Sequence, residues 1–157
     1  MPPIIRAAVA SDANSIGKLA RDFANYLRDL GDSTQFSLTA ETYLRDGFGR
    51  SPAFAGIVAD ERGMVIGYLL YHFGYDSDRA RRNLHIVDLY VDHDARRRGV
   101  GKALMLEASS IASKKGAEEM IWSVYSSNDS AKAFYTKLGA KVITEVQFMR
   151  IKTNSLR

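Results

Sequence analysis

The chain contains no cysteine among its 157 residues. Disulfide bonds, thiolate metal sites and a cysteine nucleophile are therefore excluded. Long hydrophobic runs are also absent: residues 64–71 form an apolar stretch far shorter than the about 20 residues that a membrane helix needs. Residues 1–6 lack the apolar core of a signal peptide. From these absences we expect a cytoplasmic protein.

Positive charge is in only modest excess over negative charge, and the formal net charge is +4. Much of that excess lies in two arginine clusters, at residues 79–82 and residues 96–98. Two local clusters are explained better by a local anion site than by a general nucleic-acid surface. With 46% hydrophobic and 25% charged residues, the composition is that of a globular protein. We expect residues 1–157 to form a single domain.

Hydrophobic periodicity predicts alternating strands and helices along the whole chain. Strands are predicted at residues 4–9, 53–59, 64–73, 84–91 and 120–125, and a last strand pair within residues 142–151. Helices are predicted after the capping pair Ser11 and Asp12, after Thr39, and at residues 100–115 and 128–138. This order predicts a mixed α/β domain built on a mainly antiparallel sheet.

The most informative segment is the glycine loop at residues 96–102, which reads Arg-Arg-Arg-Gly-Val-Gly-Lys. It follows a predicted strand and opens a predicted helix. The first amides of a helix have no carbonyl partner, and the helix dipole adds partial positive charge, so phosphate oxygens bind well there. Gly99 and Gly101 allow the backbone to approach such a ligand closely. The segment therefore predicts an anion site.

Two common nucleotide loops do not fit this segment. A Walker A loop requires glycine five residues before Gly101 and a hydroxyl after Lys102, where the chain has Arg96 and Ala103. A dinucleotide fingerprint requires a third glycine at position 104, which is leucine.

Residues 96–101 instead match the pattern Q/R-x-x-G-x-G/A, and residues 128–135 match N-x-x-A-x-x-F-Y, followed by Lys-Leu-Gly-Ala at residues 137–140. On these two motifs the chain resembles the GNAT superfamily of N-acetyltransferases. The resemblance implies an α+β GNAT fold, with a mixed, mainly antiparallel sheet of about six to seven strands flanked by about four helices. It also implies acetyl-CoA as the donor.

Upstream residues are similar to the diamine branch of that superfamily, which includes spermidine/spermine and thialysine acetyltransferases. They are Leu38, Thr39, Leu44, Asp46, Gly47, Phe48, Gly49, Pro52, Ala53, Phe54, Ile66, Gly67, Tyr71, Phe73, Tyr75 and Asp76. This resemblance implies a small polyamine-like or lysine-like amine as the acceptor, direct attack of that amine in a ternary complex, and a homodimer. It implies neither a nucleic-acid nor a membrane partner.

Cofactor-binding residues also follow from the resemblance. They are Leu89, Tyr90, Val91, Arg96, Arg97, Arg98, Gly99, Val100, Gly101, Lys102, Asn128, Ser130, Ala131, Tyr135 and Lys137. The backbone amides of residues 98–102 are expected to face the pyrophosphate. The edge of residues 89–91 is expected to pair with the pantetheine amides as a neighbouring strand would. Asn128 is in addition a good helix N-cap.

Acetyl transfer to an amine requires a general acid for the departing thiolate and a base for the ammonium. Tyr135 is the predicted acid, because a phenol with a pKa of about 10 keeps its proton at neutral pH. The branch commonly has Glu-Asp before the loop, but this chain has Val87 and Asp88. We therefore predict that His85, or Asp88 through a water, is the base. Alternation along the strand predicts His85, Val87 and Leu89 on one face and Asp88 on the other.

Cation recognition is predicted at Asp76, Asp88 and the aromatic Tyr26, which match positions of the diamine branch. The acidic residue that follows this tyrosine in the branch is Leu27 here, so weak polyamine selectivity is expected. No three ligands cluster at metal spacing, and no metal site is predicted. Two alternatives stay open: acetylation of a protein amino group, and a non-catalytic module that binds CoA or nucleic acid.

Overall fold

The computed structural model describes residues 1–34 and 38–156, which fall into two compact units, Met1–Tyr125 and Ser126–Arg157. The first unit contains a five-stranded sheet in the order β1-β2-β3-β4-β5. Its strands are β1 (Ile4–Ala7), β2 (Ala55–Glu61), β3 (Met64–Asp76), β4 (Arg81–Val91) and β5 (Ala117–Ile121). The first four strands are antiparallel neighbours, and β5 is parallel to β4. The predicted mixed, mainly antiparallel sheet is confirmed.

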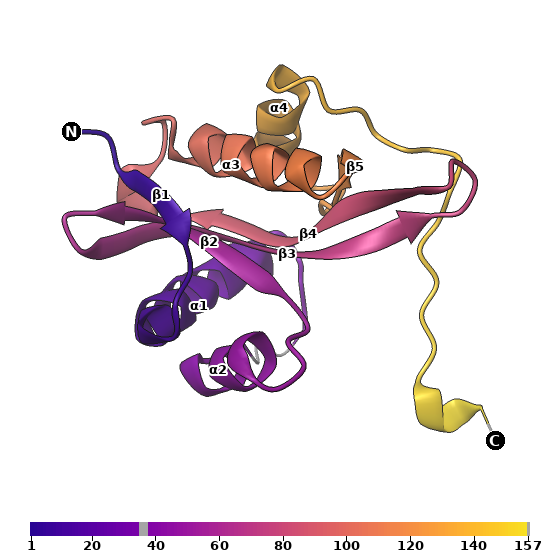
Figure 1. Ribbon diagram of the computed structural model, residues 1–157, viewed down its shortest axis with the longest axis horizontal. Coiled ribbons are helices and arrows are strands. Elements are labelled where there is room, and N and C mark those ends of the chain that lie inside the picture. Colours follow the sequence, from indigo (N-terminus) through magenta and orange to yellow (C-terminus); the bar gives the residue numbers. More distant parts are fainter. Residues whose placement is uncertain (35–37, 157) are drawn as a thin grey trace. The chain divides into compact units, whose positions relative to one another are not determined.

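Helices cover both faces of this sheet. The helices α1 (Ala13–Asp29) and α2 (Ala40–Phe48) lie on one face, and α3 (Val100–Lys114) lies on the other (Figure 1). Thr39 caps α2, because its side chain accepts a hydrogen bond from the Thr42 amide. With α4 (Asp129–Lys137) of the second unit, the described residues contain the four expected helices. None of the helices in the described part of the chain is long and apolar enough to cross a membrane.

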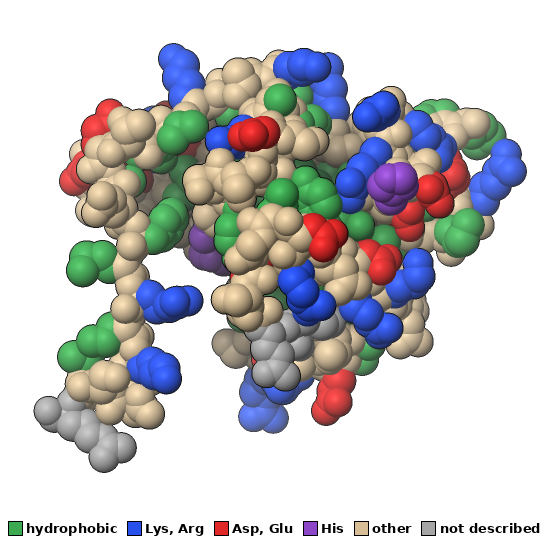
Figure 2. Space-filling view, turned by 180° about the vertical axis from the view of Figure 1, so that it is seen from behind, with side chains coloured by type: hydrophobic (Ala, Val, Ile, Leu, Met, Phe, Trp, Pro, Cys, Tyr) green, Lys and Arg blue, Asp and Glu red, His purple; other side chains and the backbone are tan. Residues whose placement is uncertain are grey.

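The second unit consists of α4, an extended segment and a short 3-10 turn, Thr153–Ser155. In Figure 2 the segment that ends at the grey C-terminal residue carries hydrophobic and basic side chains. The strand pair predicted at residues 142–151 is absent from the described residues, and the prediction of about six to seven strands was wrong: five are formed. An apolar, strand-like sequence becomes a strand only where a second backbone pairs with it.

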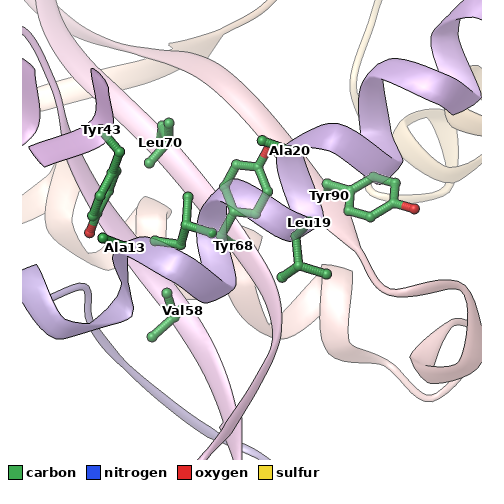
Figure 3. Packing of buried hydrophobic residues seen from close by; sticks show 9 residues of the cluster. Ala13, Leu19, Ala20, Tyr43, Val58, Tyr68, Leu70 and Tyr90 are labelled. Carbon is green, nitrogen blue, oxygen red and sulfur yellow. The ribbon is translucent and has the colours of Figure 1, made fainter. Parts of the chain in front are cut away.

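One hydrophobic cluster fills the space between the sheet and the helices α1 and α2 (Figure 3). Its fully buried members include Ile16 of α1, Tyr43 of α2, and Val58 and Tyr68 of the sheet. These positions recur with the helical and strand periods that the sequence shows. The packing fixes α1 against β3 and β4, which also form the site described below.

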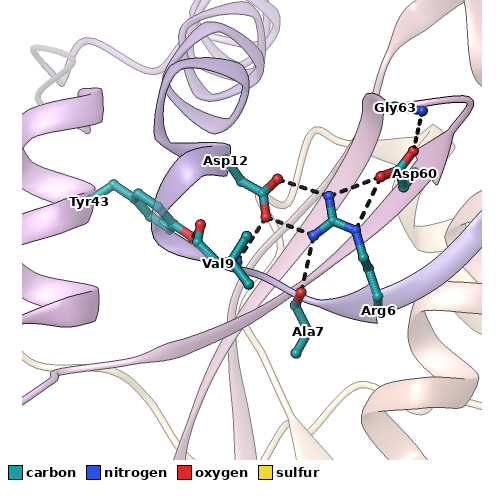
Figure 4. A network of polar contacts seen from close by, with 7 residues as sticks. All are labelled: Arg6, Ala7, Val9, Asp12, Tyr43, Asp60 and Gly63. Carbon is teal, nitrogen blue, oxygen red and sulfur yellow. Dashed lines mark hydrogen bonds and ion pairs between the residues drawn. The ribbon is translucent and has the colours of Figure 1, made fainter.

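An ion-pair network joins β1, the turn before α1, and β2 (Figure 4). The Arg6 guanidinium lies 2.9 Å from Asp12 and 3.0 Å from Asp60. Asp12 also accepts a hydrogen bond from the Val9 amide at 2.8 Å. The Arg6 contact holds the pKa of Asp12 below its usual value. This network anchors the start of α1 to the sheet.

The strand β5 begins and ends earlier than the predicted residues 120–125. The bounds of β5 are set by its parallel pairing with residues 82–85 of β4. This pairing begins at the Arg82–Ala117 pair and ends at the His85–Ile121 pair. After Ile121 the two strands no longer pair. The local pattern could not place this limit, because it depends on where β4 leaves its neighbour.

Candidate functional site

The first feature of the site is an uncovered edge at the end of β4. The β4–β5 ladder in the described residues stops at His85, whereas β4 continues to Val91 on its β3 side. The Asp92 amide donates to the Ile66 carbonyl at 2.9 Å. Hydrogen-bonded pairs alternate along an antiparallel ladder, so the backbone groups of Leu89 and Val91 point away from β3. They face the side from which β5 has diverged, where an extended ligand could pair with them.

Tyr90, between these two residues, behaves differently. It lies opposite Tyr68 in register, and by the same alternation its backbone groups are engaged with β3. Of the three residues predicted to contact the pantetheine arm, only Leu89 and Val91 therefore present backbone groups to that edge. The Val91 carbonyl already accepts a hydrogen bond from Arg96 Nε at 3.1 Å.

The loop after β4 ends in a backbone geometry suited to an anion. Gly99 has a φ of 81° and is the N-cap residue of α3, with no side chain to cap the helix. The first intrahelical bond runs from Ala103 N to Gly99 O at 3.0 Å, so the amides of residues 100–102 precede the helical ladder. A Cβ at Gly99 would meet no protein atom within 4 Å. The loop thus offers open amides to a phosphate group.

The side chain of Arg96 is committed to the protein. Its guanidinium carbon lies 5.2 Å from the ring centroid of Tyr26 and 5.2 Å from that of Tyr90. With its bond to the Val91 carbonyl, Arg96 clamps the loop between α1 and β4. Tyr26, predicted to bind substrate, is one wall of this clamp. These contacts hold the Arg96 side chain against α1 and β4.

The other cations of the loop fall into two kinds. Arg98 forms an ion pair with Glu61 at the end of β2, and this contact lowers the pKa of Glu61. Arg97 and Lys102 are exposed, and neither forms an ion pair with another of the described residues. A ligand anion would therefore meet Arg97, Lys102 and the helix amides first.

Val87, where the diamine branch carries glutamate, is a β-bulge. The register runs from Leu70–Asp88 directly to Tyr71–Ile86, which leaves Val87 without a partner on β3. A bulge shifts the alternation of side chains by one residue. His85 lies opposite His72 and therefore shares the face of Leu70 and Asp88. The prediction that His85 and Asp88 lie on opposite faces was wrong, because strict alternation ignores the inserted residue.

Asp88 is the most perturbed carboxylate of the site. Its side chain is partly buried on the face that carries Tyr68 and Tyr90, and the Tyr68 hydroxyl donates to its Oδ2 at 3.4 Å. Burial raises the pKa of Asp88 to about 6, although the Tyr68 hydrogen bond opposes this rise. A carboxylate with this pKa is ionised at neutral pH and is a stronger base than an ordinary aspartate.

His85 forms a pair with His72 across β3 and β4. His85 Nδ1 lies 2.9 Å from His72 Nε2, and the rings are perpendicular. Burial, followed by the neighbouring His72, lowers the pKa of His85. The lowered pKa makes His85 a weaker base than an ordinary histidine, and the contact with His72 occupies one of its ring nitrogens.

Asp76 lies at the tip of the β3–β4 hairpin. It accepts from the amides of Asp78 and Arg79 and pairs with the Arg79 guanidinium at 2.9 Å, contacts that lower its pKa. It lies six positions after Leu70, the partner of Asp88, which is about 20 Å along the strand. Within one chain the fold does not bring Asp76 and Asp88 together.

The arginine cluster at residues 79–82 is largely neutralised by acidic neighbours. Arg79 pairs with Asp76, and Arg81 pairs with Glu118 and with Glu119 at 2.9 Å. Among the described residues, Arg82 is the one arginine of this cluster that forms no ion pair. The cluster therefore gives little support to the nucleic-acid-binding alternative.

The second unit carries the other motif, at the start of α4. Asn128 is buried, and its side chain accepts from the Ala131 amide at 3.2 Å, as expected of an N-cap. The Tyr135 ring packs on Phe134 at 5.1 Å. Tyr135 lies seven residues after Asn128, about two helical turns away on nearly the same face.

Sequence reasoning missed two residues that act on this site, Tyr68 and Glu61. Tyr68 reads as an ordinary core aromatic, and its contact with Asp88 arises only from the β3–β4 register. Glu61 reads as a polar turn residue, and its pairing with Arg98 depends on a contact between segments 37 residues apart. Neither residue belongs to a local motif.

The chain is similar to known proteins over most of its length. Residues 20–140 match the sequence model of the Acetyltransferase (GNAT) family. Thialysine N-epsilon-acetyltransferase from Bos taurus is 31% identical over 152 residues, which cover 92% of this chain and 87% of the relative. The Mus musculus protein of the same name is 32% identical over 149 residues, with 90% and 85% covered.

Among solved structures, an integron cassette protein from the mobile metagenome of V. cholerae superposes with a TM-score of 0.80. It is 22% identical, and the superposition covers 99% of this chain and 96% of that protein. This likeness concerns the fold.

Proposed function

The chain belongs to the acetyltransferase (GNAT) family, and on that premise we propose that it transfers the acetyl group of acetyl-CoA to a primary amine of a small substrate. The observation that carries this proposal is the open N-terminus of α3, which begins directly after Gly99 and follows the uncovered edge of β4 in the chain. That combination suits a ligand with a phosphate group and an extended amide-containing arm.

Donor binding would use the backbone more than the arginine side chains. The amides of residues 100–102 would hold the pyrophosphate, with Arg97 and Lys102 adding charge. Leu89 and Val91 would pair with the amides of the extended arm. Acetyl-CoA, when bound, supplies the reactive thioester. Asn128, Ser130, Ala131 and Lys137 at α4 complete the proposed set.

The proposed base is Asp88. A primary amine with a pKa of about 10.4 arrives as an ammonium and must lose a proton before it attacks the thioester carbonyl. Asp88, with its pKa raised to about 6, is ionised at neutral pH and can accept this proton directly or through one water. His85 stays the alternative base, with its lowered pKa against it.

The proposed acid is Tyr135. Its phenol is protonated at neutral pH and would donate its proton to the sulfur as the carbon–sulfur bond breaks. The nitrogen that gains the acetyl group loses a second proton as the amide forms, and this proton restores the Tyr135 phenol. One ammonium and one thioester thus give the amide, the CoA thiol and one proton on Asp88, all within a single ternary complex.

Similarity to the thialysine acetyltransferases supports a lysine-like amino acid or a short diamine as the acceptor. Because Asp76 lies about 20 Å along β3 from the Leu70 partner of Asp88, these two carboxylates of one chain cannot bind both ends of one short diamine. Weak polyamine selectivity is therefore expected. We also propose that residues 1–157 act as one domain and that the protein is a homodimer.

A panel of amines tests the proposal by release of free CoA. The panel contains thialysine, lysine, ornithine, two diamines, spermidine and a peptide with a free N-terminus. Because the chain has no cysteine, a thiol reagent reports free CoA without background from the protein. The small lysine-like amines should give the highest kcat/KM. Tight CoA binding without acetylation of any amine would refute the proposal, and preference for the peptide would favour a protein acceptor.

A further inference from the structure

His72 and His85 form a pair on the sheet face that carries Asp88. The bulge at Val87 brings His85 to this face. His72 lies two residues after Leu70, the partner of Asp88, so the histidine pair and the carboxylate are about 7 Å apart along the sheet. His72 is exposed, and His85 is partly buried. The pair therefore lies within reach of a ligand that also contacts Asp88.

The hydrogen bonds of the pair determine which ring nitrogens carry a proton. His72 Nδ1 lies 3.4 Å from the Phe73 carbonyl, which can only accept a hydrogen bond, so this nitrogen carries the proton. In a neutral ring the other nitrogen, His72 Nε2, is then an acceptor. It lies 2.9 Å from His85 Nδ1, which must donate to it. The remaining nitrogen, His85 Nε2, is left with a lone pair.

This lone pair is available to a ligand. Burial, followed by the neighbouring His72, lowers the pKa of His85, so the neutral ring predominates at pH 7. Among the described residues, His85 Nε2 has no hydrogen-bond partner. A neutral nitrogen of this kind accepts from an N–H donor and offers nothing to a carboxylate. A ligand on this face therefore finds Asp88 at one point and a hydrogen-bond acceptor about 7 Å away.

The position of the pair along β4 suits the far end of an acceptor amine. The proposed donor-binding edge, Leu89 and Val91, lies on the other side of Asp88 in the strand. An amine that gives its proton to Asp88 and extends away from the donor therefore passes toward His85. The two nitrogens of a five-carbon diamine, or the ε and α nitrogens of lysine, are about 7.5 Å apart in an extended chain. This length matches the separation of Asp88 and the histidine pair.

We propose that His85 Nε2 accepts a hydrogen bond from the second, unreacted ammonium of the acceptor, and that His72 holds His85 in the tautomer that allows this contact. The inference rests on the proposed acetyl transfer and names the group that recognises the far end of the amine. That ammonium is the far amino group of a diamine or the α-ammonium of a lysine-like amino acid. A neutral nitrogen attracts an ammonium less strongly than a carboxylate does, which agrees with weak polyamine selectivity.

Two amines that differ only in the second nitrogen test this contact. They are 1,5-diaminopentane and pentylamine, which share the chain length and the reacting group. For the wild-type protein, kcat/KM should be at least about tenfold higher for the diamine. His85→Phe keeps a flat ring at a strand position and removes the acceptor, so this ratio should fall close to one. His93→Phe, at an exposed histidine after the end of β4, is the control and should keep the wild-type ratio.

Two substitutions of His72 test its positioning role. The carboxamide oxygen of glutamine can still accept from His85 Nδ1, whereas phenylalanine cannot. The ratio of diamine to monoamine kcat/KM should therefore be kept in His72→Gln and should fall by at least about threefold in His72→Phe. Equal ratios in the two variants would overturn the role of His72. Circular dichroism and thermal unfolding check that each variant still folds.

A series of diamines from 1,3-diaminopropane to 1,6-diaminohexane tests the spacing. The highest kcat/KM is expected for the chains of four or five carbons, because these match the about 7 Å between Asp88 and the histidine pair. A series that rises steadily with chain length would contradict a contact at a fixed distance.

Each remaining outcome also decides the proposal. A wild-type ratio in His85→Phe would overturn it, and if both amines lost activity equally, His85 would be the base instead. If no amine is acetylated, the proposed function fails, and calorimetry with the CoA-bound protein still tests the contact. The wild-type protein should then bind 1,5-diaminopentane at least about tenfold more tightly than pentylamine, and His85→Phe should bind the two equally. Equal binding of the two amines by the wild-type protein would overturn the inference.

Discussion

The Tyr68 hydroxyl donates a hydrogen bond to the Asp88 carboxylate at 3.4 Å. Burial of the carboxylate disfavours its charged form and raises its pKa to about 6, while the hydroxyl stabilises the charged form and limits that rise. Asp88 can therefore be ionised at neutral pH and still accept a proton readily. The strand register that brings these residues together also places Val87 in a bulge beside Asp88.

Replacement of Asp88 should remove a titration from the activity. If Asp88 is the base, the wild-type kcat/KM rises with pH through an apparent pKa near the about 6 of this carboxylate. Asp88→Asn should lower kcat/KM by about 100-fold or more and abolish that limb. Asp78→Asn, in the hairpin tip, is the control. A pH–rate profile of the Asp88 variant that keeps the wild-type limb would transfer the role to His85.

The same substitution should stabilise the fold at neutral pH. The folded-state pKa of Asp88 is about 6, above its ordinary value of 3.8, so the folded chain binds more protons between these values. Its contribution is favourable at low pH and is lost as pH rises through 6. Asp88→Asn should raise the free energy of unfolding at pH 7 by about 2–3 kcal/mol, but hardly at pH 4. Urea unfolding at both pH values measures this difference.

Removal of the Tyr68 hydroxyl should raise the pKa of Asp88 further. In Tyr68→Phe the carboxylate stays buried and loses the hydrogen bond that opposes its rise in pKa. The acidic limb of kcat/KM should therefore move to higher pH, with little change in the plateau. An unshifted limb would show that the group titrating in the profile is not in contact with Tyr68.

The sequence predicted the features that depend on neighbouring residues. The glycine loop, the N-cap role of Asn128, the four helices and the antiparallel order of β1 to β4 all follow from local patterns. Features that depend on long-range pairing did not follow. The bulge at Val87, the early end of β5 and the Tyr68 contact with Asp88 are set by register. The strand pair predicted at residues 142–151 failed for the same reason, since a local pattern does not show whether a second backbone pairs with it.

Glycine at position 99 should be required for two reasons: the left-handed backbone conformation and the close approach of the ligand. With a φ of 81°, Gly99→Ala should cost about 1 kcal/mol of stability through left-handed strain. The added Cβ meets no protein atom, so any further effect must come from the ligand. Gly116→Ala is the matched control, because Gly116 has a φ of 76° and equally open space at the other end of α3.

Calorimetry with CoA distinguishes these two glycines. Both variants should lose similar stability, but only Gly99→Ala should lose CoA affinity. Equal affinity in the two variants would mean that the pyrophosphate does not approach the backbone at Gly99.

Arg96 and Arg97 are adjacent in sequence and should behave differently when replaced. Arg96→Gln removes the contacts with Tyr26 and Tyr90 and should lower the free energy of unfolding by about 1–2 kcal/mol. Arg97→Gln changes an exposed side chain and should leave stability unchanged within about 0.5 kcal/mol.

The salt dependence of CoA binding then distinguishes a variant that displaces the loop from one that only removes a positive charge. Arg97→Gln removes an exposed cation whose attraction to the ligand is screened by salt. The affinity of this variant for CoA should therefore lie below the wild-type value at low ionic strength and approach it at high ionic strength. Arg96→Gln displaces the loop itself, so its loss of affinity should persist at every salt concentration. If Arg96→Gln instead showed the salt-dependent loss, its guanidinium would bind the anion directly, and the clamp between α1 and β4 would have to open when CoA binds.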